Sequence, residues 1–408
     1  MSQACTVLSS ILFVFVAACQ TGSTTGSVAD DSTSGADGQG GCGGDDQSSG
    51  GSVMPLAAGA SGAMMGGSGG VAGKVGTGGI AATGGMAGTG GSASTGGIGG
   101  GAQPLGTIPM FVAVGRGGRR IMSCDKGRTW VANQFVSTED GEHSTFTPKG
   151  LAYANGTFVF LSGWGNPSTT WISRNGVDWL EQKHQNGFAG IGVDDGQFVL
   201  VGTDHQESSK DNGSTWTKLT TATIDLGRES AAFDGIWAAG ADGEVRVLRK
   251  GTASWMSLAG CVGGRHGGIG ADGGFTAGLG IMLSVGYEGD VCGINIAAGK
   301  PIAASKLNAE VRGKPAFVGD GFMIATGDKL FASTNGTNWT ARSLPTNVRI
   351  DLVARDGLGT YIGLSLDGKS FFYSDNGMAW TKASAPAGNE MVSVRAGAGL
   401  PSALCKLP

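Results

Sequence analysis

Basic side chains recur along the C-terminal three quarters of the chain, each shortly before a predicted strand. Acidic side chains, among them Glu229, Glu310, Asp351 and Glu390, lie between them in the sequence. Cations that converge in a mouth of low dielectric attract anions, so the basic groups are candidate ligands for a carboxylate, a phosphate or an acidic glycan. The alternative is that each cation pairs with a neighbouring carboxylate or is solvated at a rim. The candidate residues are Lys149, Arg228, Arg265, His266, Arg312 and Arg349.

An aromatic and a second basic group fall in loops expected to open on the same side. Trp164 is the aromatic, and Arg116, Arg119 and Arg120 form the basic cluster. They are candidates to extend a ligand surface, and solvated loop residues are the alternative. No zinc pattern accompanies them, because the chain has no C-x-x-C and its four histidines are scattered. We therefore expect neither a metal ion nor a cofactor.

The elements that position these residues come from a repeat. Two full copies of one motif, Ser123 to Trp130 and Ser209 to Trp216, and three shortened copies place Ser, Asp or Asn, Gly and Trp in a fixed order. An Asp or Asn side chain accepts backbone N–H groups inside its own turn, and Gly adopts a backbone conformation that strains other residues. We expect these residues to be structural. They are Ser123, Asp125, Gly127, Trp130, Asn175, Gly176, Trp179, Ser209, Asp211, Gly213, Trp216, Asn335, Gly336, Trp339, Asn376, Gly377 and Trp380.

The motif resembles the Asp-box, or BNR repeat, of sialidases, written S-x-D-x-G-x-T-W. Its tryptophans are mostly 37 to 49 residues apart, and one gap of 84 residues fits two units with an eroded copy near Ala297 to Gly299. Asn-Gly or Asp-Gly pairs, including Asp272-Gly273, recur in phase and precede short apolar runs. Each unit therefore reads as four antiparallel strands, and seven units predict an all-β, seven-bladed β-propeller over 106–408.

The two ends of this domain complement each other. The first unit begins with the apolar run Met110 to Val114 and lacks the strand that should precede it, while Met391 to Ala396 supplies a spare strand. Pairing them would close the ring and remove an exposed sheet edge.

Four cysteines in the domain allow three disulfide connectivities. We favour Cys261 with Cys292 and Cys124 with Cys405, the second fastening the C-terminal strand beside the first Asp-box.

The first 105 residues differ from the rest. Residues 1–19 read as a signal peptide that ends in Val-Ala-Ala-Cys, which resembles the lipobox of bacterial lipoproteins and predicts lipidation of Cys19. The next residue is Gln20 rather than Asp, which by resemblance to the known sorting rule favours the outer membrane over the inner membrane. Residues 20–105 are rich in Gly, Ser and Ala, so we expect a disordered tether spanning about 50 Å.

Charge and motifs narrow the function classes. Five Asp against one Lys in the tether account for the whole formal charge of −4, so the domain is balanced and gives no reason to expect nucleic acid. The sialidase resemblance stops short of the active site, because no Arg-Ile-Pro occurs and Thr107-Ile108-Pro109 lacks the Arg. We expect a monomeric, lipid-anchored binding or scaffolding module of the cell envelope, with a glycan or a protein as ligand and no enzymatic activity. The alternatives are a divergent glycan-processing hydrolase and an assembly factor resembling the photosystem-assembly propellers.

Overall fold

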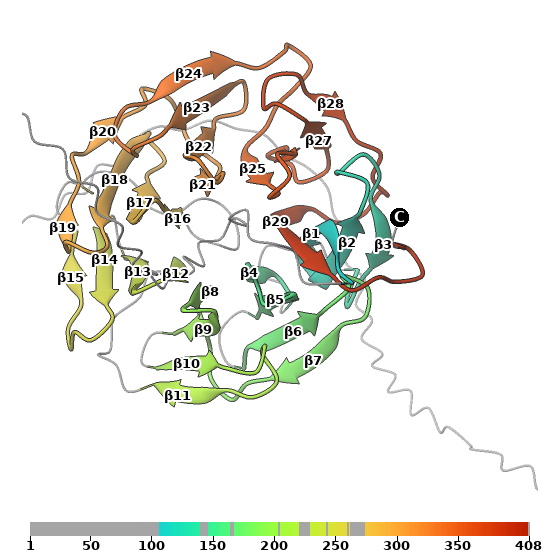
Figure 1. The fold of residues 1–408 in the computed structure, drawn as a ribbon, viewed down its shortest axis with the longest axis horizontal. Helices are drawn as coiled ribbons and strands as arrows, with labels where there is room; N and C mark the ends of the chain where they lie inside the picture. The colour runs from blue at the N-terminus through green and yellow to red at the C-terminus, as the bar shows by residue number, and fades with distance from the viewer. Residues whose placement is uncertain are drawn as a thin grey trace, which may run out of the picture. The chain divides into compact units, whose positions relative to one another are not determined.

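Seven antiparallel sheets are arranged radially around one axis in the computed structural model (Figure 1). The structure describes residues 106–138, 146–163, 167–202, 205–219, 229–241, 244–258, 261 and 274–406. The fold is therefore the predicted all-β, seven-bladed propeller. None of the described residues forms a helix that is long and apolar enough to cross a membrane. The predicted signal peptide with Cys19 and the predicted tether of residues 20–105 lie outside the described residues.

Within each blade the strands follow one another from the axis outward. Blade 1 contains β29 (Met391–Gly399), β1 (Ile108–Gly115), β2 (Arg119–Ser123) and β3 (Val131–Gln134), with the short 3-10 helix η1 (Arg116–Gly118) between β1 and β2. Blade 2 contains β4 (Pro148–Ala154), β5 (Thr157–Ser162), β6 (Thr169–Ser173) and β7 (Leu180–Lys183). Blade 3 contains β8 (Gly190–Asp194), β9 (Gln197–Val201), β10 (Gln206–Ser209) and β11 (Thr217–Leu219).

The remaining blades follow the same order along the chain. Blade 4 contains β12 (Glu229–Phe233), β13 (Ile236–Ala241), β14 (Glu244–Arg249) and β15 (Met256–Ser257). Blade 5 contains β16 (Phe275–Gly278), β17 (Ile281–Val285), β18 (Asp290–Asn295), β19 (Lys300–Pro301) and β20 (Ser305–Lys306). Blade 6 contains β21 (Ala316–Phe317), β22 (Phe322–Ala325), β23 (Lys329–Ser333) and β24 (Thr340–Ser343). Blade 7 contains β25 (Leu352–Arg355), β26 (Tyr361–Leu364), β27 (Phe371–Ser374) and β28 (Thr381–Lys382).

Blade 5 departs from the predicted unit in two ways. Its outer position is shared by two short strands, because β19 pairs with one end of β18 and β20 pairs with the other. The turn that leads into its apolar strand β17 is Leu279-Gly280, whereas Asp272-Gly273 precedes β16 and lies outside the described residues. The eroded copy near Ala297 to Gly299 occupies the turn between β18 and β19, and this turn carries no Trp to hold a continuous outer strand.

The second strand of each blade forms the core. In β5 all six residues are buried, and β1, β9 and β22 are similarly apolar and covered. Such strands contact a neighbouring blade on each face, so both sets of alternating side chains must be apolar. This explains the short continuous apolar runs in the sequence.

The C-terminal strand closes the ring. β29 pairs antiparallel with β1 from Ile108 opposite Gly399 to Gly115 opposite Met391, and it is the innermost strand of blade 1. Figure 1 shows this strand, in red, beside the blue-green start of the domain. Strands from both ends of the domain therefore build one sheet, as the sequence predicted.

The loops divide between two faces. Turns that join the first two strands of adjacent blades touch each other, since the Asn155 side chain donates to the Gly196 carbonyl and the Gly235 N–H donates to Asp194. The turns that carry the repeated Ser, Asp or Asn, Gly and Trp motif join the third and fourth strands and so lie at this same end. We call them Asp-box turns after the motif that they resemble, and we call this end the Asp-box face. The connections between blades and the loops between second and third strands lie at the opposite end, which we call the connection face.

Candidate functional site

The two full Asp-boxes use their carboxylates inside their own turns. Asp211 Oδ1 accepts from Ser209 Oγ and from the Thr215 N–H, each at 2.8 Å, and Oδ2 accepts from Thr215 Oγ1 at 2.6 Å. The Gly213 N–H donates to Ser209 Oγ at 2.7 Å. These hydrogen bonds, led by those from Thr215, lower the pKa of Asp211 to about 2. The carboxylate therefore holds the turn.

The shortened boxes do the same work with an amide. Asn175 Oδ1 accepts from the N–H groups of Val177 at 3.0 Å and Asp178 at 2.8 Å, and the other two Asn copies repeat the pattern. The Trp179 indole N–H then donates to the Gly176 carbonyl at 3.1 Å. An Asn can replace Asp because only an acceptor oxygen is required in the turn.

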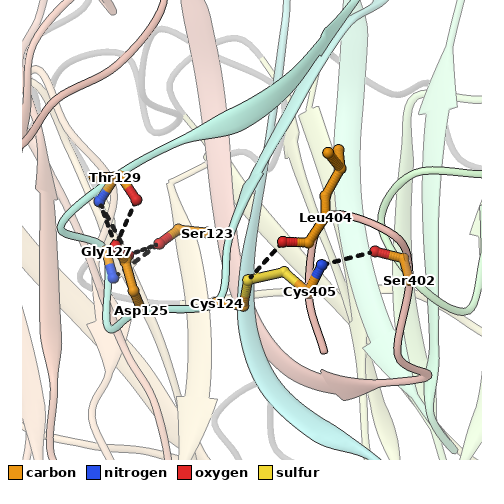
Figure 2. Close-up of a disulfide and its surroundings, with 8 residues drawn as sticks. All are labelled: Ser123, Cys124, Asp125, Gly127, Thr129, Ser402, Leu404 and Cys405. Carbon is orange, nitrogen blue, oxygen red and sulfur yellow. Dashed lines mark hydrogen bonds between the residues drawn. A yellow bond between two sulfur atoms is a disulfide. The ribbon is translucent and has the colours of Figure 1, made fainter. Parts of the chain in front are cut away.

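Two disulfides join the cysteine pairs that the sequence favoured. Cys261 and Cys292 are bonded within a buried apolar cluster between blades 4 and 5. Cys124 and Cys405 are bonded across a sequence separation of 281 residues. Figure 2 shows the second disulfide beside the first Asp-box, where Cys124 follows Ser123 and precedes Asp125. The chain after β29 is thereby fastened to the Asp-box face of blade 1.

Three of the six candidate cations lie in the described residues. Lys149 is half-buried in β4 of blade 2, whereas Arg312 and Arg349 are exposed on the connections that lead to blades 6 and 7. Arg228, Arg265 and His266 lie outside the described residues, as does Trp164. The structure therefore brings Arg312 and Arg349 to one sector of the connection face.

Arg312 belongs to a hydrogen-bonded cluster on that sector. Its Nε donates to Glu310, and the same carboxylate accepts from the Tyr287 hydroxyl of the loop between β17 and β18. The hydrogen bond from Tyr287, with the Arg312 contact, lowers the pKa of Glu310, and the pKa of Tyr287 is raised because its proton is held by Glu310. The three groups are exposed, so a ligand can reach them.

Asp351 is the buried carboxylate of this sector. It stands just before β25 and is buried. Burial raises its pKa, while a backbone hydrogen bond from Leu366 and the charges of Arg312 and Arg349 oppose that rise. The sector thus holds an exposed carboxylate that stays ionised and a buried one that is shifted toward its neutral form. We call the five residues Tyr287, Glu310, Arg312, Arg349 and Asp351 the rim cluster.

The basic cluster near the start of the domain does not form a ligand surface. Arg116 pairs with Glu390 at 2.8 Å. Arg119 and Arg120 are buried in β2 instead of lying in a solvated loop, and Arg119 donates to backbone carbonyls of Pro386 and Asn389. Arg120 lies 4.7 Å from the ring of Trp171 in blade 2, and burial lowers its pKa to about 10. These arginines join blades 7, 1 and 2.

Sequence reasoning missed a buried cluster between blades 2 and 3. His184 Nδ1 lies 3.3 Å from Glu207 Oε2, and its Nε2 lies 3.0 Å from Thr170 Oγ1. Hydroxyl, imidazole and carboxylate in this order are typical of an activated nucleophile. Thr170 is fully buried, however, so a substrate has no access to its hydroxyl. No local motif links residues 170, 184 and 207, because blade packing alone brings them together.

No family model and no curated protein matched this chain. Among solved structures, the chain is similar to BamB from Moraxella catarrhalis, with 10% identity, a TM-score of 0.40 and coverage of 71% of this chain and 96% of that chain. It is also similar to a structure described as YCF48 bound to D1 peptide, with 13% identity, a TM-score of 0.43 and coverage of 74% and 95%.

Proposed function

We propose that this protein is a lipid-anchored binding or scaffolding propeller of the cell envelope, and that a glycan or a protein binds to the rim cluster. The observation that supports this proposal is the exposed group of Tyr287, Glu310 and Arg312, which offers donors and an acceptor on the connection face. The side chains of the Asp-box residues, by contrast, already make hydrogen bonds within their own turns. Binding therefore belongs to the connection face.

The chemistry of the rim cluster suits a ligand with hydroxyl or carboxylate groups. A guanidinium has five N–H donors in a planar fork. Arg312 donates to Glu310 through Nε, so a ligand that reaches its terminal nitrogens can receive further hydrogen bonds. Arg349 adds a second exposed cation, and the charges of Arg312 and Arg349 both favour the ionised form of Asp351.

The test is a binding screen of the full chain carrying Cys19→Ser, which prevents lipidation, on glycan and cell-envelope protein arrays. For any ligand found, we expect Arg312→Ala with Arg349→Ala to weaken binding by about tenfold or more, since each lost charged hydrogen bond is worth about 1.5–3 kcal/mol. Arg342→Ala is the matched control, because Arg342 is an exposed cation on the outer strand β24 of blade 6. Unchanged affinity in the double variant would contradict the proposal.

One observation favours the hydrolase alternative. Paired acid and base carboxylates have environments that push their pKa values apart, and the pKa of Glu310 is lowered while that of Asp351 is raised. The raised pKa of Tyr287 keeps its hydroxyl protonated, so an attack by this group would require Glu310 to accept the proton. An assay with fluorogenic glycosides distinguishes a hydrolase from a binding module. Hydrolysis that disappears in the Asp351→Asn variant would establish an enzyme. We expect no hydrolysis above background.

The assembly-factor alternative is one form of protein binding at the same site. It requires that the protein captured by the rim cluster be a membrane protein during its biogenesis. The Arg312→Ala, Arg349→Ala variant would then lower the amount of that membrane protein in cells, whereas Arg342→Ala would not. A captured partner whose abundance is unaffected would leave binding without an assembly role.

A further inference from the structure

The hydrogen bonds inside the rim cluster restrict the kind of ligand that it can hold. Glu310 accepts from the Tyr287 hydroxyl and from Arg312 Nε, and both donors use the same oxygen, Oε1. The side chains of Glu310 and Arg312 are 46% and 45% exposed, so a ligand can reach the second oxygen, Oε2, and the terminal nitrogens of the guanidinium. The cluster therefore offers a hydrogen-bond acceptor and hydrogen-bond donors side by side.

The backbone holds these side chains in a fixed arrangement. The Val311 N–H donates to the Tyr287 carbonyl at 2.8 Å, and the Leu307 N–H donates to the Gly289 carbonyl at 2.9 Å. Leu307 and Val311 are buried in the apolar core between blades 5 and 6. At Gly289 the two segments approach so closely that an added Cβ would lie 2.5 Å from the Ala309 carbonyl oxygen. A preformed site of this kind loses little conformational entropy when a ligand binds.

The Glu310 carboxylate opposes the binding of an anion at this place. The hydrogen bond from Tyr287, followed by that from Arg312, lowers the pKa of Glu310, so the group is ionised at neutral pH. A carboxylate or phosphate that approached Arg312 would lie beside this negative charge and compete with it for the guanidinium. Arg312 therefore acts as a hydrogen-bond donor whose positive charge is already balanced.

Two neighbouring cations are balanced in the same way. Lys306 Nζ lies 3.2 Å from Asp290 Oδ1 and 4.0 Å from Glu288 Oε2. The charge of Arg349 favours the ionised form of the buried Asp351. Because these cations have carboxylate partners, a ligand gains little affinity from negative charge of its own.

Two adjacent hydroxyls of a sugar ring match the groups of the cluster. A hydroxyl both donates and accepts, so one hydroxyl can donate to Glu310 Oε2 while its neighbour accepts from a terminal nitrogen of Arg312. The apolar C–H face of a sugar ring packs on an aromatic side chain, and Tyr287 is 40% exposed beside this pair. Such a ligand brings no charge that has to be neutralised.

We infer that the ligand of the rim cluster is a neutral glycan, held through two adjacent ring hydroxyls by Glu310 and Arg312 and packed on Tyr287. This inference rests on the proposed function, in which a ligand binds the rim cluster, and it selects one class among the ligands considered for that site. A carboxylate, a phosphate and an acidic glycan are disfavoured because each places negative charge beside Glu310.

The test compares neutral glycans with uronate-bearing and phosphorylated glycans on one array, with the full chain carrying Cys19→Ser as the probe. We expect the chain to prefer neutral glycans such as glucans, mannans and galactans. Glu310→Gln should weaken this binding by about tenfold or more, because a hydrogen bond to a charged acceptor is lost. The same variant should bind phosphorylated glycans better than the parent does, since the charge of Arg312 is then unopposed.

Glu288→Gln is the matched control for this substitution. It removes the same charge from the loop between β17 and β18 that carries Tyr287, and the Glu288 carboxylate lies beside Lys306. The control should therefore bind like the parent. Thermal unfolding verifies that each variant is folded.

Two further measurements examine the aromatic contact and the role of charge. Tyr287→Ala should weaken the binding of the neutral glycan by about tenfold, because apolar area no longer leaves water. Tyr287→Phe keeps the ring and should weaken binding less. The affinity of the parent should change little between low and high salt, whereas recognition of an anion would weaken as salt screens the charges.

The outcomes separate this inference from the proposed function. A parent chain that binds no neutral glycan, or that prefers acidic ones, would overturn the inference. So would a Glu310→Gln variant that keeps its affinity for neutral glycans, or a protein ligand that depends on Arg312 and Arg349. In the last case a ligand still binds the rim cluster and the proposed function stands, whereas a ligand unaffected by the Arg312→Ala, Arg349→Ala variant contradicts both.

Discussion

The Asp or Asn side chain of each Asp-box turn accepts hydrogen bonds from groups of its own turn. Asp211 receives two bonds from Thr215 and one from Ser209, and the Asn copies receive two backbone N–H groups. Asp takes the place of Asn in the two turns where a Thr hydroxyl also donates, because the carboxylate has a second oxygen that accepts this bond. Charge enters only as a consequence, through the low pKa of Asp211.

Asp211→Asn should therefore change the acid response of the protein more than its stability at neutral pH. The folded pKa of about 2 lies below the ordinary value of 3.8, so the stability from this group is present above about pH 4 and is lost as the pH falls toward 2. Chemical unfolding measured between neutral and acid pH should give a shallower loss for Asp211→Asn than for the parent. Asp211→Ala, which removes the acceptor, should be less stable at every pH. An unchanged acid slope in the Asn variant would contradict this view of the turn.

At the scale of the element, blades are held together where turns touch their neighbours. Gly336 of the blade 6 box has a φ of +74°, and a Cβ built there would lie 2.9 Å from the Leu283 side chain of blade 5. The turn motif in the sequence predicts the positive φ of Gly336. The lack of space for a Cβ at this residue comes from the packing of blade 6 against blade 5.

Gly336→Ala should lower the free energy of unfolding by about 2–4 kcal/mol, combining the positive φ with overpacking. Gly251→Ala is the control, because Gly251 has a φ of +84° in the turn between β14 and β15 of blade 4 and no atom lies within 4 Å of the added Cβ. It should cost about 1–2 kcal/mol from the backbone alone. Urea unfolding of the two variants separates the terms, and equal losses would mean that blade contact at Gly336 contributes nothing.

The His184 cluster makes the contact between blades 2 and 3 sensitive to pH. Burial lowers the pKa of His184 below its ordinary 6.5, and Glu207 opposes the shift. The unfolded chain therefore binds a proton before the folded chain does, so stability should fall as the pH drops below about 6.5. His184→Gln should flatten this part of the profile, and Glu207→Gln should extend it to lower pH. Thermal unfolding between about pH 5 and 8 measures both, and a profile unaltered by His184→Gln would exclude this role.

At the scale of the whole molecule, the ring is closed by strand pairing and by a covalent bond. The bond of Cys124 with Cys405 closes a span of 281 residues, whereas that of Cys261 with Cys292 closes one of 31 residues. In the chain-entropy model, the longer loop should stabilise the fold by at most about 5–6 kcal/mol and the shorter one by about 3–4 kcal/mol.

Replacing both cysteines of the long-range pair by Ser should therefore lower the unfolding free energy more than the same change in the short-range pair. The reason is that the unfolded chain regains more conformations when the longer loop opens. Guanidinium unfolding of the two double variants gives the comparison. A larger loss from the short-range pair would show that burial of Cys261 and Cys292, rather than loop closure, governs the effect.

The sequence by itself determined the blade count, the Asp-box turns and the need for Met391–Gly399 to pair with the first apolar strand. These features are local or repeat at a fixed period, so turn chemistry and apolar runs are enough to read them. Only the tertiary structure decided which charged and aromatic side chains of separate blades interact with each other. Arg312, on the connection to blade 6, acts on the charge of Asp351 on the connection to blade 7, Arg120 packs on Trp171 of blade 2, and His184 of blade 2 lies beside Glu207 of blade 3. Such contacts depend on the stacking of blades around an axis, and the spacing of residues along a chain does not record that stacking.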